Sequence, residues 1–293
     1  MEGLPDLHRH LDGSLRPSTL AELADADGVE VPEDLAFSPG MGLRAALDRF
    51  ALTLSLLKTP DRVRRVAAEI CEDAAADGVT TLEIRFAPQL HVGAPIEAIV
   101  EAALDGIDGR AGLLVCGLYG EPPALVERLA RQEGIAGLDL AGGPTPAQSF
   151  ALADYAPAFT LARDRGIGRT VHASEGRPPD EIATAVERLH AQRIGHGTTL
   201  LDDPAVLDLV LAREVTIEAC PTSNWQTSAI SSIDAHPLPR WLELGVRACV
   251  NTDNTLFSEV TASEEHRRAR AIRGMTAEKL DAAIAHGHAA AFG

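Results

Sequence analysis

Cysteine is scarce in this sequence, and the few cysteines lie far apart. None of them forms a C-x-x-C pair; they are Cys71, Cys116, Cys220 and Cys249. A disulfide framework or a thiolate zinc site requires paired or regularly spaced cysteines, so this spacing argues against both. We therefore expect four reduced thiols that are mostly buried and behave as small apolar side chains.

Positive charge is also in short supply. The chain has 26 lysines and arginines against 43 aspartates and glutamates, which leaves a net charge of −17 at pH 7. No Lys/Arg run forms a basic stripe against this background, so nothing in the composition attracts the phosphates of a nucleic acid or the headgroups of an anionic membrane. We predict no nucleic-acid partner and no membrane partner.

Long apolar runs are missing as well. No stretch approaches the roughly 18 to 20 apolar residues that a membrane-spanning helix needs. The first residues, Met1 to Arg9, lack the basic start and apolar segment of a signal peptide. We expect a cytoplasmic protein, and the sequence carries no indication of its oligomeric state.

Short β-rich runs alternate with longer Ala/Leu/Glu/Arg-rich runs of helical period. Eight runs are predicted as strands, and most are apolar along their length, as parallel strands buried on both faces should be: Gly3–His8, Thr80–Ala87, Leu113–Gly120, Ile135–Ala141, Arg169–Ala173, Gln192–Gly195, Val215–Cys220 and Val246–Asn251. Among the segments between them, four are predicted as helices with the start and stop residues that helices favour: Asp61–Asp77, Pro95–Asp108, Pro178–Ala191 and Pro204–Arg213.

This alternation, repeated about eight times in under 300 residues, predicts an α/β fold with one (β/α)8 TIM barrel. No linker or low-complexity tract interrupts the chain, so one domain over residues 1–293 is expected. An open doubly wound sheet remains an alternative, because periodicity alone often miscounts strands. The segment Gly28–Pro60 forms a long insertion after the first strand, and such insertions often cover a pocket.

Unusual polar residues gather where the predicted strands end, which is where barrel enzymes keep their catalytic groups. The first strand ends Asp6-Leu7-His8-Arg9-His10. In an extended chain residues i and i+2 face the same side, so the imidazoles of His8 and His10 can converge on one ion. An H-x-H pair alone is equally compatible with ordinary surface or core histidines.

The ends of the fifth, sixth and eighth strands add His172 with Glu175, His196, and Asp253. Imidazole nitrogen and carboxylate oxygen are ligands that suit Zn2+, so three histidines and one aspartate could hold it. A fourth histidine and a glutamate would then remain for proton transfer, as metal-assisted hydrolysis requires. Each residue alone could be a structural group bonded to backbone carbonyls, but their joint occurrence favours a metal-dependent hydrolase.

The remaining histidines are interpreted as solvated or structural, because they lie in loops, before a proline, or in or near predicted helices; they are His91, His190, His236, His266, His286 and His288. Cys220, which precedes Pro221, is interpreted as a small buried residue.

Six segments resemble, in order and spacing, the motifs of the adenosine deaminases of the amidohydrolase superfamily: His8–Leu15, Gly137–Gly142, Val171–Glu175, Arg193–Gly197, Cys220–Asn224 and Asn251–Asp253. The resemblance covers nearly the whole chain. It implies a (β/α)8 barrel and one Zn2+ per subunit, with ligands His8, His10, His172 and Asp253.

The resemblance also implies roles for the other polar residues. Asp253 and His196 would handle the attacking water, and Glu175 would donate a proton to purine N1. Such a donor needs a raised pKa, which a partly desolvated pocket supplies. The substrate would be contacted by His10, by Asp12 at a ribose hydroxyl, by the backbone N–H of Gly142 at purine N3, and by Asn254.

Three positions depart from the family pattern. Asn254 stands where a second aspartate usually contacts purine N7, and an amide N–H can also donate to N7. Gly143-Pro144 stands where an acidic residue is common. Ser174 replaces a glycine, which would cost about 1 kcal/mol or more if the position requires a positive φ.

The sequence thus predicts zinc-dependent removal of the 6-amino group of an adenine nucleoside, with adenosine and 2′-deoxyadenosine as leading substrates. A modified adenine nucleoside or free adenine is an alternative, for example 6-aminodeoxyfutalosine or 5′-methylthioadenosine. More remote alternatives are a catalytically silent nucleoside-binding relative and a hydrolase of other amides or esters. The chain lacks the H-x-E and P-C-x-x-C motifs of cytidine-deaminase-type enzymes, which disfavours that chemistry.

Overall fold

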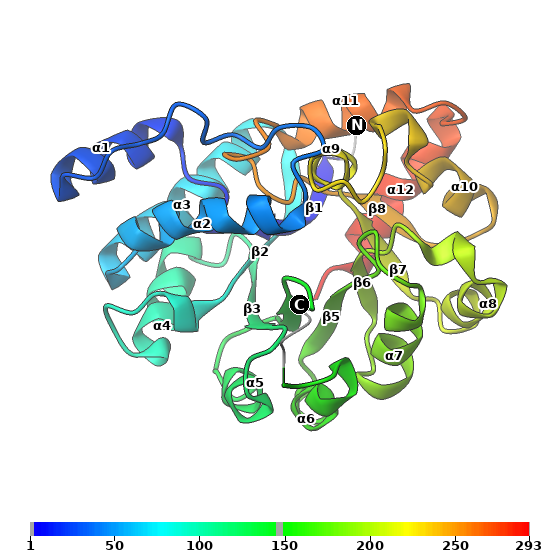
Figure 1. Cartoon of the computed structure of the whole chain (residues 1–293), viewed down its shortest axis with the longest axis horizontal. Coiled ribbons are helices and arrows are strands. Elements are labelled where there is room, and N and C mark those ends of the chain that lie inside the picture. The colour runs from blue at the N-terminus through cyan, green and yellow to red at the C-terminus, as the bar shows by residue number, and fades with distance from the viewer. Residues whose placement is uncertain (1–2, 145–148, 293) are drawn as a thin grey trace.

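Eight parallel strands form one barrel in the computed structural model, which describes residues 3–144 and 149–292. Each strand pairs with the next in sequence order, and helices surround the sheet (Figure 1). The strands are β1 Leu4–His10, β2 Val79–Phe86, β3 Gly112–Leu118, β4 Gly137–Ala141, β5 Gly168–Ala173, β6 Arg193–His196, β7 Thr216–Ala219 and β8 Ala248–Val250. Every predicted strand is present, with each end within two residues of the expected one.

Closure between the last and the first strand excludes the open doubly wound sheet. Just beyond β8, Asp253 forms a parallel bridge with Arg9 of β1. The Asp253 N–H donates to the His8 carbonyl at 2.8 Å, and the His10 N–H donates to the Asp253 carbonyl at 2.8 Å. The TIM barrel prediction is therefore confirmed.

Twelve α-helices occur in the described part of the chain: α1 Pro17–Asp27, α2 Leu43–Leu56, α3 Pro60–Ala76, α4 Ile96–Ile107, α5 Pro123–Leu129, α6 Ala156–Asp164, α7 Asp180–Arg188, α8 Pro204–Ala212, α9 Pro221–Gln226, α10 Leu238–Glu243, α11 Ala262–Ala271 and α12 Ala277–Ala290. Short 3-10 turns lie at Pro88–Leu90, Leu152–Tyr155, Leu200–Asp202 and Ile233–Ala235. All four predicted helices are present. Helix α7 is shorter than expected and ends before His190, whose φ of 55° leaves the helical region.

The predicted insertion Gly28–Pro60 contains α2 and follows α1, and both helices lie along one side of the barrel (Figure 1). Side chains of α2, including Leu43, Leu47 and Phe50, line a cavity at the mouth of the barrel. The prediction that this insertion covers a pocket is therefore confirmed.

The other end of the barrel is closed by Phe292. Its ring lies against the first residues of β4 and β5, where a Cβ on Gly168 would lie 2.1 Å from the Phe292 Cγ and one on Gly137 would lie 2.9 Å from Cδ2. Glycine is required at these two strand starts because the aromatic ring occupies the space of a side chain. The guanidinium of Arg193 stacks on the same ring, with its Cζ 3.7 Å from the ring centroid.

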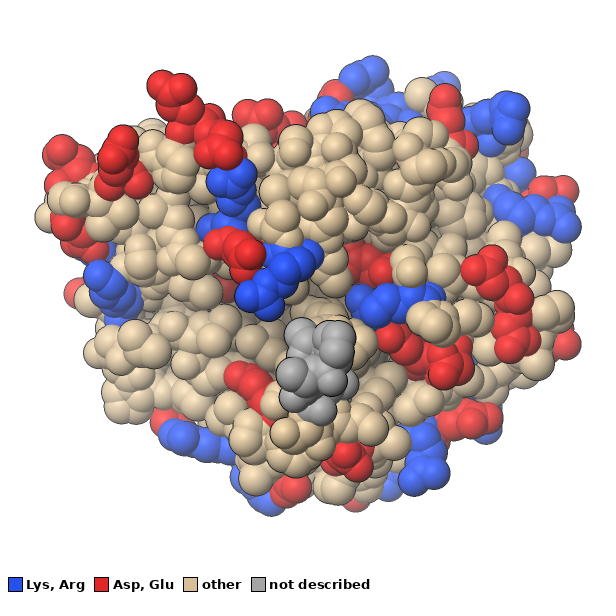
Figure 2. Space-filling model, in the orientation of Figure 1, with Lys and Arg blue, Asp and Glu red and all other residues tan. Residues whose placement is uncertain are grey.

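Charged groups are dispersed over the outer surface. The face seen in Figure 2 shows acidic and basic side chains side by side and no continuous basic stripe. Within the described residues, no helix is long and apolar enough to span a membrane.

Candidate active site

A cavity of about 440 Å³ opens at the carboxyl ends of the strands. Eight of the nine residues singled out from the sequence line it: His10, Asp12, Gly142, His172, Glu175, His196, Asp253 and Asn254. The ninth, His8, lies beneath the lining and is fully buried. The structure thus brings together residues from five different strand ends, those of β1, β4, β5, β6 and β8, as the barrel topology requires.

Three of the four strand-end histidines form one cluster. The ligand nitrogens of His8, His10 and His172 lie within 4.8 Å of one another. His10 Nε2 is 3.2 Å from His172 Nε2 and 3.5 Å from Asp253 Oδ1, and His8 Nε2 is 3.8 Å from the same oxygen.

This donor set fits a divalent cation. His8 Nε2 is buried and has no hydrogen-bond partner among the described residues, which is unfavourable unless an ion or water binds there. Burial, together with nearby positive groups, holds the pKa values of His8 and His10 well below the ordinary value, so both imidazoles are neutral and have lone pairs available. Neutral imidazoles and one carboxylate are a typical catalytic zinc ligand set.

Strand geometry and a buried ion pair position these candidate ligands. His8 and His10 point the same way because they are two residues apart in β1. Asp253 is held in a left-handed backbone conformation, with φ 63°. Asp6 fixes the adjoining residues, since its carboxylate accepts from the Thr252 hydroxyl at 2.7 Å and pairs with Arg9 at 2.7 Å.

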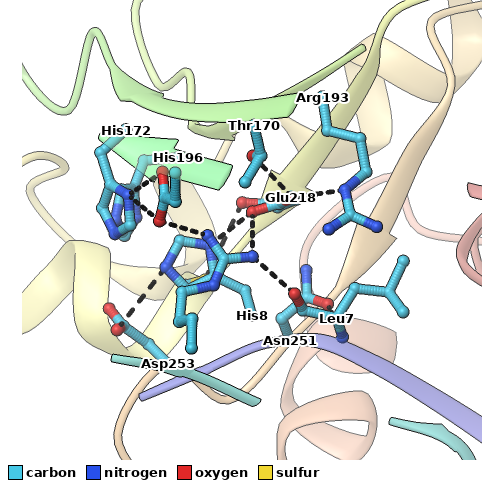
Figure 3. A network of polar contacts seen from close by, with 12 residues as sticks. Leu7, His8, Thr170, His172, Arg193, His196, Glu218, Asn251 and Asp253 are labelled. Carbon is cyan, nitrogen blue, oxygen red and sulfur yellow. Dashed lines mark hydrogen bonds and ion pairs between the residues drawn. The ribbon is translucent and has the colours of Figure 1, made fainter. Parts of the chain in front are cut away.

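Behind the cluster lies a fully buried charged network that the sequence reasoning did not identify (Figure 3). Glu218 of β7 accepts from His8 Nδ1 at 2.7 Å, and Asp139 of β4 pairs with His172 Nδ1 at 3.0 Å. Arg85 of β2 links them, with 2.9 Å to Glu218 and 3.0 Å to Asp139. Because each carboxylate accepts the Nδ1 proton, the Nε2 lone pairs of both imidazoles face the cluster.

His196 packs against the cluster, with its ring centroid 4.9 Å from that of His8 and 5.1 Å from that of His172. Its Nδ1 is 2.9 Å from the Asn224 amide nitrogen, and the Asn224 carbonyl oxygen is 3.2 Å from His236 Nε2. Since the amide donates to Nδ1, His196 carries its proton on Nε2, which lies 4.0 Å from Glu175 Oε2. Burial lowers the pKa of His196 to about 3, so the ring is neutral. His236, interpreted from sequence as solvated or structural, is buried and orients His196 through Asn224.

Glu175 is buried beside the cavity, in an environment that disfavours the charged form of its carboxyl group. It is 7% exposed, and its Oε1 accepts from the Thr227 hydroxyl at 2.8 Å. Burial raises its pKa above the ordinary value, while the Thr227 hydrogen bond and the charge of Arg177 partly offset this rise. Thr227 was not identified from the sequence, because it carries no motif and reaches the site from the end of α9.

The residues expected to contact substrate line the cavity wall. Asp12 is buried, its Oδ1 has no partner within the described residues, and burial raises its pKa to about 7. The Asn254 amide nitrogen donates to Asp253 Oδ1 at 2.7 Å, and its side chain packs where a Cβ on Gly13 would lie. Gly142 adopts φ 76°, a conformation that favours glycine.

The imidazoles of the remaining five histidines lie outside the cavity lining, in hydrogen bonds such as the 2.8 Å contact of His91 Nδ1 with the Leu57 carbonyl. All four cysteines are free and buried, as expected. Cys220 nevertheless lies with His8 and Asp253 in a second possible ligand group, and burial raises the pKa of its thiol well above the ordinary value.

Comparisons with known sequences agree with this geometry. A sequence model of the family described as adenosine deaminase matches residues 4–292. The adenosine deaminase of Shigella boydii serotype 18 is 34% identical over an alignment that covers 99% of this chain and 93% of that protein. A Dictyostelium discoideum protein named "Probable adenosine deaminase" is 36% identical over 90% of this chain, and the alignment covers 37% of that longer protein.

Solved structures of similar fold include enzymes with purine ligands and metal. The structure of an ADAL–IMP complex has a TM-score of 0.87 and 26% identity, with coverage of 100% of this chain and 93% of that one. A Burkholderia ambifaria amidohydrolase with bound Zn has a TM-score of 0.88 and 25% identity, with 99% and 86% coverage. With its barrel, its clustered strand-end histidines and the family match over residues 4–292, the chain belongs to the adenosine deaminase family of hydrolytic deaminases.

Proposed function

We propose that this chain hydrolyses the 6-amino group of an adenine nucleoside, with adenosine and 2′-deoxyadenosine as the leading substrates. One observation carries the proposal: a cluster of three histidines with a carboxylate faces the buried Glu175 carboxyl, whose pKa is raised by burial, across one cavity of about 440 Å³. A cavity of this size suits a nucleoside. The reaction adds water to purine C6 and releases ammonia, which leaves the 6-oxo product.

In this proposal His8, His10, His172 and Asp253 hold one Zn2+. Bound there, the ion would lower the pKa of a water molecule towards about 7 and so supply a nucleophile at neutral pH. Support comes from the convergent donor atoms, from the unpartnered His8 Nε2 and from the Zn in the B. ambifaria relative.

The proton transfers fall to three side chains. Glu175 protonates purine N1, which makes C6 more electrophilic, and its raised pKa favours the protonated form that this step requires. Asp253 accepts a proton from the attacking water. His196 directs its Nε2–H at the oxygen that adds to C6, because Asn224 occupies its other nitrogen.

Substrate contacts follow from the cavity wall. The unpartnered Asp12 carboxylate suits a sugar hydroxyl, and the Gly142 N–H suits purine N3. His10 lines the cavity beside the reacting carbon. Asn254 has one amide hydrogen left after its bond to Asp253, and this hydrogen can donate to purine N7.

Asn254 and Gly143-Pro144 favour one second candidate within the same chemistry. Asn254 and Gly143 line the cavity, where they would contact the imidazole ring and the glycosyl side of the purine, and both positions depart from the family pattern. The alternative substrate is a modified adenine nucleoside or free adenine. A catalytically silent relative is disfavoured, because none of the proposed ligands or proton donors is missing.

A turnover assay tests the proposal. Zinc-loaded protein is mixed with adenosine, 2′-deoxyadenosine, adenine, 5′-methylthioadenosine or 6-aminodeoxyfutalosine, and loss of the 6-amino chromophore is followed by absorbance. Metal-dependent turnover of adenosine or 2′-deoxyadenosine is expected. Turnover of only one of the other three compounds would assign that compound as the substrate. The absence of turnover with all five compounds would refute the proposed function.

A further inference from the structure

The backbone between His172 and Glu175 adopts an unfavourable conformation at Ser174. Its φ is 55°, in the left-handed region that residues other than glycine rarely adopt. Glu175 follows directly, so a rotation at Ser174 would swing the Glu175 carboxyl away from Thr227 and the cavity. A non-glycine residue persists in this region only where surrounding contacts determine its conformation.

Hydrogen bonds hold Ser174 on three sides. Its N–H donates to Glu181 Oε2 at 2.7 Å. Its hydroxyl donates to the Pro178 carbonyl at 2.9 Å, and its carbonyl accepts from the Thr198 hydroxyl at 3.0 Å. The contact with Glu181 is charge-assisted and is therefore the strongest of the three.

Glu181 is itself fixed in place. It lies in the first turn of α7, and Arg177 Nε donates to both of its carboxylate oxygens, at 2.8 and 3.0 Å. The Arg177 guanidinium lies 5.7 Å from the Tyr119 ring centroid, and the Tyr119 hydroxyl donates to the His172 carbonyl at 2.8 Å. The segment from His172 to Glu175 is thus tied at both ends to one set of contacts.

Glu181 does not line the cavity, and its side chain is 15% exposed. We propose that Glu181 is a positioning residue, which holds Glu175 in place for proton transfer by fixing the left-handed backbone of Ser174. This inference rests on the proposed function, because it assigns Glu181 to the same proton donor.

A double-mutant cycle between positions 174 and 181 tests the proposal. Glu181→Ala should lower kcat by about ten- to a hundredfold, since small displacements of a catalytic group have effects of this size. KM should change little, because Asp12, Gly142 and Asn254 stay in place. Glu181→Gln keeps an acceptor for the Ser174 N–H and should retain most of the activity.

Glycine at position 174 provides the decisive comparison. Because glycine adopts a positive φ without support, Glu181→Ala should cost much less in a Ser174→Gly background than in the natural one. Glu187→Ala removes an exposed carboxylate from the same helix and serves as the matched control. Zinc content of every variant is measured, so that loss of metal is distinguished from loss of positioning.

Two results would overturn the proposal: wild-type kcat in Glu181→Ala, or an equal loss in the serine and glycine backgrounds. Urea denaturation of the natural protein, Glu181→Ala, Ser174→Gly and the double variant gives a readout that needs no substrate. If the enzyme turns over none of the adenine compounds, the proposed function fails, while non-additive unfolding free energies would still show that Glu181 holds Ser174. Additive values would show that it does not.

Discussion

Replacing Glu218 with glutamine should weaken metal binding although Glu218 is not a ligand. Its carboxylate accepts from His8 Nδ1 and contacts Arg85, Thr170 and Arg193, all within 2.9 Å. Glutamine offers one acceptor oxygen and an NH2 group, so a donor would face either His8 or an arginine. The His8 ring would then lose the contact that fixes its tautomer and orientation.

The magnitude follows from two separate effects. Loss of a carboxylate that supports a ligand histidine typically costs 10- to 100-fold in metal affinity, and we expect about this reduction for Glu218→Gln. Removing one partner from a buried ion network costs about 3 to 5 kcal/mol of unfolding free energy. Thr170→Val removes only one neutral donor to the same carboxylate and should cost about 1 kcal/mol.

Chelator competition measures the first effect and urea denaturation of the apoprotein measures the second. Wild-type zinc affinity in a folded Glu218→Gln protein would refute the reasoning, because His8 would then be oriented without its carboxylate. Equal losses of affinity in Glu218→Gln and Thr170→Val would also refute it, since the valine variant leaves the His8 contact intact.

Three other predictions concern separate parts of the molecule. Glu175→Gln should retain zinc and lose about 10²- to 10⁴-fold in kcat, measured by absorbance, and full turnover would disprove its role as proton donor. The pKa of Asp12 is raised by burial to about 7. The stability that protonated Asp12 contributes is therefore fully present below its unfolded pKa and is lost as the pH rises to 7. Urea denaturation should show this loss, roughly up to 4 kcal/mol, and Asp12→Asn should abolish the pH dependence. Phe292→Ala should lower the unfolding free energy by about 3 kcal/mol, and an unchanged melting temperature would show that the ring does not close the barrel.

Sequence periodicity was sufficient to predict the barrel, because each strand is a short apolar run followed by a helix of different period. It was also sufficient for His8 and His10, since residues two apart in a strand share a face. The positive φ considered for Ser174 is present, at 55°. Periodicity does not indicate which residues hold Ser174 in this conformation, because Glu181 and Thr198 come from other segments.

The supporting carboxylates were missed for a physical reason. Asp139 and Glu218 lie in buried strands, where a charge is unfavourable unless it is paired. A charged residue within an apolar strand is therefore a signal, and Glu83, Arg85 and Arg193 carry the same signal. The sequence does not show which of them pair, since each partner comes from a different strand.

The barrel interior gives these buried charges a common role. Arg193 pairs with Glu83 and Glu218, and Arg85 pairs with Glu218 and Asp139, so three carboxylates and two guanidinium groups form one chain of contacts. Buried ion pairs contribute little net stability compared with apolar packing, so stability alone does not account for four of them in one core. This series of contacts runs from Phe292 at the closed end of the barrel to His8 and His172 at the cavity. These five groups carry one more negative than positive charge, which favours binding of a cation at the histidine cluster. Their fixed geometry also orients His8 and His172, two of the histidines that would bind the cation.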